Sequence, residues 1–330
     1  MADSDMGKHR ILVVTDNLKD QINGVAITFK HLAKEAERSG YEMHFLDPSE
    51  FFHFSFPAYK EIKLAFPFRI SRKIESIQPD YIHVATEGPI GLAAKLYCDR
   101  NNLWYNTSYH TKFPEYMKSL YGIPTDYTYK YLRWFHKHSG VVLTTTKSMK
   151  SLLIENKFDG NIVEWTRGVD MSNLTGLERA PDNSVLFVGR VSKEKNIEEL
   201  LKLQDKYNIV IVGDGPDRKH LEQKYKKAKF VGYKTGKELF QYYLNASVFC
   251  FPSKTDTFGI VMVEAMSAGT PVAAFPVVGP IDIVDSGING ILDDNLETAI
   301  DRCFELGRIN TKEWSWEACW NIFHQNLIEV

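Results

Sequence analysis

Short apolar runs alternate with segments of helical periodicity along almost the whole chain. Residues 11–15 (ILVVT) are continuously apolar, which is typical of a strand buried on both faces of a parallel sheet. Residues 26–39 then repeat apolar side chains at helical spacing, and Gly40 is a natural stop for that helix. This order predicts an α/β protein with mostly parallel sheets. In the first half, further strands are expected at residues 41–46, 81–85, 104–109 and 141–145, and further helices at residues 89–100, 126–138 and 147–155.

The alternation restarts after a polar, turn-rich stretch at residues 171–183 (MSNLTGLERAPDN). The chain has 330 residues, enough for two domains, so we expect two doubly wound domains with a cleft between them. In open α/β sheets, ligands lie at the carboxyl ends of the strands. In the second half, strands are expected at residues 184–188, 208–212, 229–231, 247–251 and 271–275, and helices at residues 196–206, 217–227, 237–245 and 258–267.

Composition excludes several classes of protein. The chain is 44% hydrophobic and 25% charged, which is ordinary for a globular protein and excludes disorder. Its net charge of −2 gives no basis for binding nucleic acid. No apolar run approaches the roughly 18 residues of a membrane span. The four cysteines are far apart, without metal-binding spacing, so we expect a reduced, cytoplasmic protein.

Three loops that follow expected strands carry candidate anion ligands. Asn23 and Gly24 precede a helix, where backbone amides can bind an anion, although a plain turn explains them equally well. Arg190 and Lys195 follow a strand end at Gly189 and suit a diphosphate; the alternative is a solvated charged loop. The GDGP turn that starts at Gly213 lacks the spacing of a dinucleotide site, and we interpret it as mainly structural.

The segment PSKTDTFGIVMVE, residues 252–264, is the most informative. An apolar strand leads into a polar loop with Asp256, and the helix that follows carries Glu264 in an apolar stretch. Amides at the helix start favour a phosphate. A carboxylate beside a phosphate is repelled, so both acids are expected to face sugar or ribose hydroxyls, and a buried acid needs a partner. His110, which ends another expected strand, is a further candidate ligand.

The order of these motifs resembles the retaining glycosyltransferases of family four, which have the GT-B fold of two facing Rossmann-like domains. The resemblance covers nearly the whole chain. It implies domains at residues 1–170 and 171–311, and a last helix at residues 312–330 that crosses back to the first domain. The matching segments are NGV, SYHTKFPEY, RGVD, FVGRVSKEKN, VGDGP, FVGY and PSKTDTFGIVMVEAMSAGTPV.

The resemblance also implies roles for single residues. Arg190 and Lys195 would neutralise the leaving diphosphate, Glu264 would bind ribose hydroxyls, and His110 and Asp256 would position the transferred sugar. His110, Arg190, Lys195, Asp256 and Glu264 are therefore the expected catalytic residues. The expected substrate-binding residues are Asn23, Gly24, Arg167, Gly189, Gly213, Gly232, Tyr233, Thr257, Phe258, Gly259 and Ile260, with Thr257 to Ile260 acting through the backbone and Tyr233 lying near the nucleobase.

The family usually has Glu where this chain has Asp256. Aspartate occurs there in a subgroup that resembles glycolipid mannosyl-, glucosyl- and sulfoquinovosyl-transferases, so the donor, a GDP- or UDP-hexose, stays open. Because protein cations would balance the diphosphate, no metal or other cofactor is expected. Two alternatives remain: a nucleotide-sugar 2-epimerase on the same fold, which needs no acceptor, and a catalytically silent nucleotide-sugar-binding protein.

The acceptor is expected to be a lipid or a glycan. The segment from Lys60 to Lys73 (KEIKLAFPFRISRK) holds five cations and one acid with interleaved apolar residues, which suits an anionic membrane surface. We therefore allow for peripheral membrane binding. Residues 127–138 mix aromatic and basic residues in the same way, but an amphipathic helix packed on the sheet explains them better. The chain is 13% aromatic, and much of this content lies in residues 41–68 and 97–135, where we interpret it as acceptor or membrane contact.

Overall fold

The structure, a computed structural model, describes residues 8–18, 24–56, 59–110, 113–254, 256, 258–310 and 314–330. The chain divides into two units. Unit 1 comprises Met1–Gly168 and Trp316–Val330, and unit 2 comprises Val169–Ser315. The sequence places its boundaries after residues 170 and 311.

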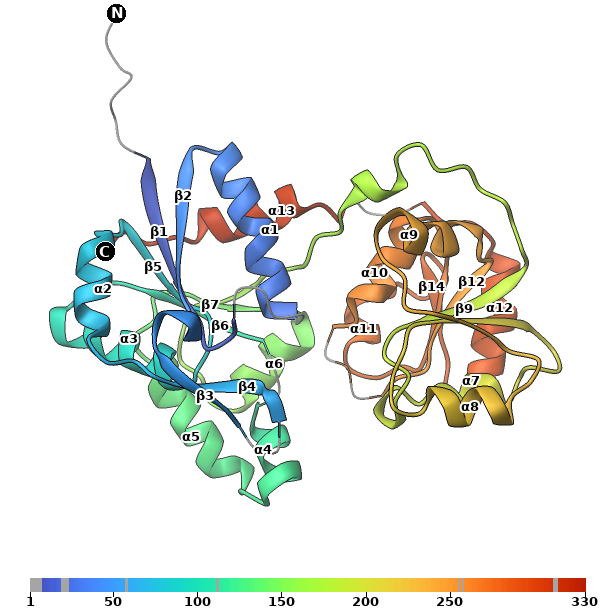
Figure 1. The fold of residues 1–330 in the computed structure, drawn as a ribbon, viewed down its shortest axis with the longest axis horizontal. Coiled ribbons are helices and arrows are strands. Elements are labelled where there is room, and N and C mark those ends of the chain that lie inside the picture. The colour runs from blue at the N-terminus through green and yellow to red at the C-terminus, as the bar shows by residue number, and fades with distance from the viewer. Residues whose placement is uncertain are drawn as a thin grey trace, which may run out of the picture. The chain divides into compact units, whose positions relative to one another are not determined.

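Unit 1 is built on a six-stranded parallel sheet with the order β2-β1-β5-β6-β7-β8. Residues 11–14, which lie in β1, are fully buried because helices cover both faces of the sheet (Figure 1). The strands are β1 (His9–Val14), β2 (Tyr41–Leu46), β5 (Tyr81–Val84), β6 (Asn106–Tyr109), β7 (Val142–Thr144) and β8 (Ile162–Glu164). The helices are α1 (Gly24–Arg38), α2 (Ile70–Ile77), α3 (Pro89–Asn101), α4 (Phe113–Tyr121), α5 (Thr125–His136), α6 (Lys147–Glu155) and α13 (Trp316–Gln325).

Unit 2 repeats this plan, with a six-stranded parallel sheet in the order β11-β10-β9-β12-β13-β14. The expected α/β class with two doubly wound, Rossmann-like units is therefore confirmed. The strands are β9 (Ser184–Val188), β10 (Asn208–Val212), β11 (Lys229–Gly232), β12 (Val248–Phe251), β13 (Val272–Ala274) and β14 (Gly290–Leu292). The helices are α7 (Ile197–Leu201), α8 (Arg218–Lys224), α9 (Gly236–Asn245), α10 (Ile260–Ser267), α11 (Pro280–Ile283) and α12 (Leu296–Leu306).

The last helix, α13, belongs to unit 1 although it follows unit 2 in the sequence. Its first residue, Trp316, stacks on His31 of α1 with ring centroids 4.4 Å apart, and Figure 1 shows α13 beside α1. The helix is shorter than expected. Trp314 precedes it and packs in unit 2 against Phe258, with centroids 6.4 Å apart. Trp314 therefore packs in unit 2, whereas Trp316 packs in unit 1.

A two-stranded antiparallel hairpin, β3 (Phe52–Phe56) and β4 (Tyr59–Phe66), was not anticipated. The basic segment from Lys60 to Lys73 forms most of β4 and the start of α2, and Lys73 pairs with Glu50 at 2.8 Å. The second basic–aromatic segment forms α5, which buries one face against the strands of the sheet, as the amphipathic-helix interpretation predicts. Helix α7 is also shorter than expected, because turns replace helix after Leu201.

Candidate functional site

In unit 2, charged side chains gather at the carboxyl edge of the sheet. Arg190 follows β9 after one intervening glycine, Gly189, and is exposed, and Lys195 lies in the turn after it. Asp256 follows β12, the strand next to β9. The Nζ atom of Lys195 donates to both carboxylate oxygens of Asp256, at 2.6 and 2.8 Å. The structure thus brings together two predicted site residues that are 61 positions apart in the sequence.

The glycines at this edge allow neighbouring strands to end in close backbone contact. The amide of Gly189 donates to the carbonyl of Val212 at 3.0 Å, and that of Gly213 donates to the carbonyl of Gly232 at 2.9 Å. At Gly213, φ is +137°, and a Cβ atom would lie 1.9 Å from the carbonyl oxygen of Gly189. Any side chain there would clash with the backbone. These glycines therefore have a packing role at the strand ends, whatever they bind.

Glu264 lies in α10 and is largely buried. Its Oε2 atom accepts a hydrogen bond of 2.7 Å from the phenol of Tyr243 in α9. Burial raises the pKa of Glu264 to about 7, an effect that the Tyr243 hydrogen bond partly opposes. The partner expected for this acid is thus present. Tyr243 itself was missed, because a tyrosine inside an apolar helix pattern normally indicates only core packing.

The remaining predicted residues of unit 2 differ in exposure. Tyr233 follows β11 and is 67% exposed, so its ring is available for stacking. Phe258 is buried in the core, so only its backbone is left for a ligand. Gly259 has a φ of +71° and precedes α10, which starts at Ile260. Thr257 lies outside the described residues.

In unit 1, two predicted residues meet at the end of β6. His110 follows this strand, and its Nδ1 atom lies 3.1 Å from Nη2 of Arg167. Arg167 is buried, and its Nη1 atom donates to Oγ1 of Thr28 in α1. Gly24, another predicted residue, is exposed and begins the same helix. Asn23 lies outside the described residues.

Burial sets the charge states of this pair. It lowers the pKa of His110 well below its usual value, and the positive charge of Arg167 lowers it further. Burial also lowers the pKa of Arg167 to about 10, and no carboxylate in the described part of the chain forms an ion pair with its guanidinium. The guanidinium lies over the ring of Trp165, 5.5 Å from the centroid. Unit 1 therefore holds a cation beside a neutral imidazole.

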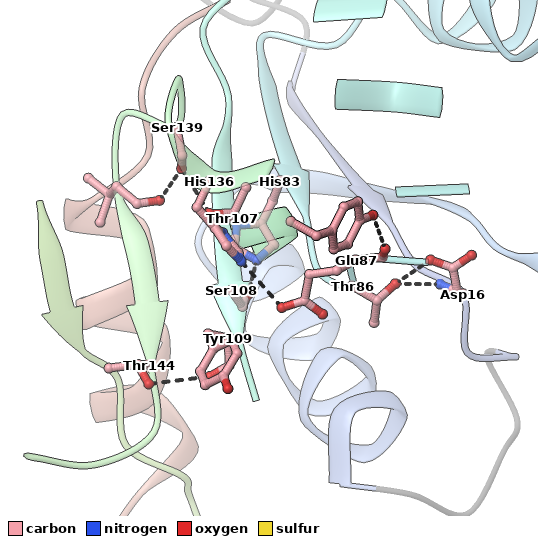
Figure 2. A network of polar contacts seen from close by, with 12 residues as sticks. Asp16, His83, Thr86, Glu87, Thr107, Ser108, Tyr109, His136, Ser139 and Thr144 are labelled. Carbon is pink, nitrogen blue, oxygen red and sulfur yellow. Dashed lines mark hydrogen bonds and ion pairs between the residues drawn. The ribbon is translucent and has the colours of Figure 1, made fainter. Parts of the chain in front are cut away.

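A buried polar network supports the same edge of the unit 1 sheet (Figure 2). His83 of β5 contacts the hydroxyl of Ser108, and His136 of α5 contacts Oγ1 of Thr107 at 2.8 Å. Burial lowers the pKa of His83 to about 3, so its ring is neutral. Because these contacts join β5, β6 and α5, they fix β6, the strand that His110 follows.

Asp16, after β1, extends this network (Figure 2). Its carboxylate accepts hydrogen bonds from the hydroxyl of Thr86 at 2.7 Å and from the amide of Ile90, in the first turn of α3, at 2.8 Å. Burial raises its pKa, an effect that these hydrogen bonds oppose. Asp16 thus stabilises the start of α3, which is a structural role.

Two features are absent from the described residues. They contain no group of three or more His, Cys, Asp or Glu side chains placed to hold a metal ion. Among them there is also no helix that is both long and apolar enough to cross a bilayer.

Comparisons with known proteins agree with the two-unit architecture. The model of the family "Glycosyl transferases group 1" matches residues 176–301, and that of "Glycosyltransferase Family 4" matches residues 22–173. A GDP-mannose-dependent alpha-mannosyltransferase of Mycobacterium tuberculosis is 28% identical over 317 residues, which cover 86% of this chain and 83% of that protein. The sulfoquinovosyl transferase SQD2 of Arabidopsis thaliana is 30% identical over 266 residues, which cover 72% of this chain and 51% of that protein.

Among solved structures, a sucrose-phosphate synthase from Thermosynechococcus elongatus superposes with a TM-score of 0.73 at 17% identity. The match covers 96% of this chain and 98% of that one. At this identity the likeness concerns the fold, which is the expected GT-B fold.

Proposed function

We propose that this chain, which belongs to the glycosyltransferases of family 4, moves a hexose from a nucleoside-diphosphate sugar to a hydroxyl of a lipid or glycan. The transfer retains the anomeric configuration in this proposal. The main support is the charged cluster of unit 2. Arg190 and Lys195 follow β9 and Asp256 follows the neighbouring strand β12, at the carboxyl edge of one sheet, where open α/β sheets bind ligands. Glu264 lies in α10, the helix that comes after Asp256.

In the proposed mechanism the protein stabilises charge and supplies no nucleophile. As the bond between C1 of the sugar and the diphosphate oxygen breaks, negative charge develops on the leaving group. Arg190 and Lys195 stabilise that charge, which is the task of a metal ion in other transferases. The acceptor oxygen then bonds to C1 on the same face, and its proton passes to the departing phosphate oxygen.

Each acid has a different part in this proposal. Glu264 accepts hydrogen bonds from ribose hydroxyls, and its hydrogen bond from Tyr243 orients the carboxylate for that contact. Asp256 is paired with Lys195 in the structure. When the diphosphate attracts Lys195, Asp256 is released to accept a hydroxyl of the transferred sugar. His110 contacts the same sugar.

The test starts from a screen of GDP- and UDP-hexoses by thermal shift, since a bound donor stabilises the native state. The matching donor is then incubated with diacylglycerol or oligosaccharide acceptors, and the anomer of the product is read by NMR. A product of retained configuration, formed equally fast in EDTA, supports the proposal. An epimerised sugar formed from the donor alone would identify the 2-epimerase instead, and binding without turnover would identify a silent binding protein.

We further propose that unit 1 meets its acceptor at an anionic membrane surface through the β3–β4 hairpin. Phe52 pairs with Phe66 across the hairpin, and the rings stack with centroids 6.1 Å apart, yet Phe52 is 76% and Phe66 56% exposed. The opposite face of the hairpin packs inward through Ala65. The hairpin therefore turns its aromatic face towards solvent, where a contiguous apolar surface is costly.

Cations border this aromatic face. Phe68, just after β4, is 75% exposed, and the guanidinium of Arg69 lies 5.0 Å from its ring centroid. Arg72 is exposed one helical turn later. Aromatic rings flanked by arginines suit the boundary between headgroups and acyl chains. This surface differs from the expected one, because phenylalanines dominate it and Lys73 is neutralised by Glu50.

Co-sedimentation with vesicles of phosphatidylglycerol and phosphatidylcholine tests this contact. The double variant Phe52→Ser/Phe66→Ser should bind at least about tenfold more weakly, because each buried Phe contributes roughly 1.5–3 kcal/mol. Phe304→Ser, which removes an exposed ring from unit 2, is the matched control and should bind like the parent. Binding that is insensitive to the hairpin variants or to the anionic lipid would refute the membrane proposal while leaving the transferase proposal intact.

A further inference from the structure

We infer that Arg167 fixes His110 as the neutral tautomer with its hydrogen on Nε2, which makes this histidine a hydrogen-bond donor to the substrate and not a general base. The inference rests on the proposed function only for the nature of the oxygen that receives the hydrogen bond. Arg167 is a positioning residue in this account, because it acts through His110.

The direction of the contact follows from the chemistry of arginine. A guanidinium has five N–H donors and no acceptor, and it keeps its charge in proteins. The Nη2 atom of Arg167 lies 3.1 Å from Nδ1 of His110, so Nδ1 must accept the hydrogen bond. A neutral imidazole that accepts at Nδ1 carries its hydrogen on Nε2.

Besides His110, two residues hold Arg167 in this position. Oγ1 of Thr28 donates its own hydrogen to the carbonyl of Gly24 at 2.6 Å, which leaves its lone pairs free to accept from Arg167. The ring of Trp165 lies against the guanidinium. The indole of Trp165 in turn donates to the carbonyl of Cys319 in α13 at 3.1 Å. The guanidinium therefore cannot turn away from His110 without breaking other contacts.

The hydrogen on Nε2 of His110 is left for a ligand. Nε2 is buried and has no hydrogen-bond partner among the residues that the structure describes. A buried donor without a partner costs roughly 1–3 kcal/mol. His110 is partly exposed as a residue. In this account an oxygen of the bound sugar accepts the hydrogen bond from Nε2. Binding of that oxygen would remove the cost.

Protonation of His110 is opposed by its surroundings. In the described part of the chain, the charged or titratable groups that act on the ring are Arg167 and His83, and its ring neighbours are Phe29 and Trp165. None of these supplies a negative charge that would stabilise an imidazolium. The neutral state is therefore expected throughout the range in which a free histidine titrates. A transfer in which the leaving phosphate takes the proton needs no base from the protein.

The first experiment reads the tautomer by long-range ¹H–¹⁵N NMR of histidine-labelled protein, with His110→Gln used for assignment. We expect the Nε2–H pattern for His110 from pH 5 to 8, without titration. In Arg167→Met, the pKa of His110 should move up towards 6.5, while Arg167→Lys, which can also only donate, should retain the parent pattern. Titration of His110 in the parent protein, the Nδ1–H pattern, or no change in Arg167→Met would overturn the inference.

A second experiment separates a donor from a base at position 110. The side-chain amide of His110→Gln can replace the Nε2 donor, whereas His110→Glu supplies a base and no donor. We expect kcat/KM to fall about tenfold in the first and at least about a hundredfold in the second. The reverse order would show general-base catalysis and overturn the inference. The NMR result does not depend on turnover, so it stands or fails separately from the proposed transferase activity.

Discussion

The candidate sites of the two units differ in the charge of their side chains. In unit 2 the site consists of charged side chains, with Lys195 and Asp256 held as a pair and Arg190 exposed. In unit 1, His110 is a neutral ring whose Nε2 atom has no hydrogen-bond partner among the described residues, and the cation on its other nitrogen, Arg167, is buried. The contrast matches the charges of the two proposed substrates: a diphosphate needs compensating cations, while sugar and acceptor hydroxyls need only hydrogen-bond partners.

The strongest test of this contrast removes a cation from unit 2. Arg190→Ala should lower kcat by about 10²–10³-fold, as loss of one electrostatic ligand of a transition state does. Circular dichroism and Tm should stay close to those of the parent, since Arg190 is exposed. Lys193→Ala, in the same loop and also exposed, is the control and should be nearly silent. Equal effects of both would favour the solvated-loop interpretation.

The ionisation of Glu264 should make the free energy of unfolding depend on pH. Its pKa is about 7 in the folded protein and 4.5 ordinarily, so the folded state favours the neutral acid. Its contribution to the free energy of unfolding is thus complete below pH 4.5, decreases between pH 4.5 and 7, and is lost above pH 7, a change of up to about 3 kcal/mol.

Urea unfolding of the parent and of Glu264→Gln at pH 5 and pH 8 measures this change, because the other titrating groups cancel in the comparison. The variant should gain stability relative to the parent as the pH rises. An equal difference at both values would show that Glu264 titrates near its ordinary pKa.

A smaller effect is expected from the partner of Glu264. Tyr243→Phe removes the hydrogen bond that favours the carboxylate, so the pKa of Glu264 should rise further and less of it should be ionised at pH 7. The KM for the donor should increase about tenfold, with the largest increase at acidic pH. Tyr242→Phe, the neighbouring residue in α9, provides the control. A loss confined to kcat would contradict the role in ribose binding.

The smallest change is expected at Asp256. Its side chain and that of Lys195 are about a quarter exposed, and such pairs contribute only about 0–1 kcal/mol. Asp256→Asn keeps an acceptor oxygen for a sugar hydroxyl and frees Lys195 for the diphosphate. The KM for the donor should therefore change less than about threefold. A much larger loss would mean that the carboxylate charge itself takes part in the transfer.

The sequence was most informative where burial and secondary structure agree. The runs ILVVT and SVLFV predict strands because central parallel strands are buried on both faces, and β1 and β9 are found there. The hairpin escaped prediction for the opposite reason. In FHFSF the phenylalanines alternate as in a strand, but Phe52 and Phe54 are turned to solvent, so the usual assignment of apolar residues to the core fails.

Candidate site residues could be predicted from the sequence where a motif places them at strand ends, as for Lys195 and Asp256. Contacts between distant segments could not be predicted. Tyr243 meets Glu264 only because α9 and α10 pack together, and Arg167 meets His110 only because the segments after β8 and β6 end near α1. Nothing in the spacing of these residues indicates such pairs, since they depend on tertiary packing.

The placement of α13 has a consequence for the order in which the chain can fold during synthesis. Unit 1 begins first but is completed by residues 316–330, where Val330 donates its amide to the carbonyl of Asp80 and Cys319 accepts from Trp165. Unit 2 lies wholly within one continuous segment. The ribosome therefore releases all of unit 2 before it has made the last helix of unit 1. The core of the N-terminal unit can be completed only after unit 2 has been synthesised, although most of unit 1 is made first.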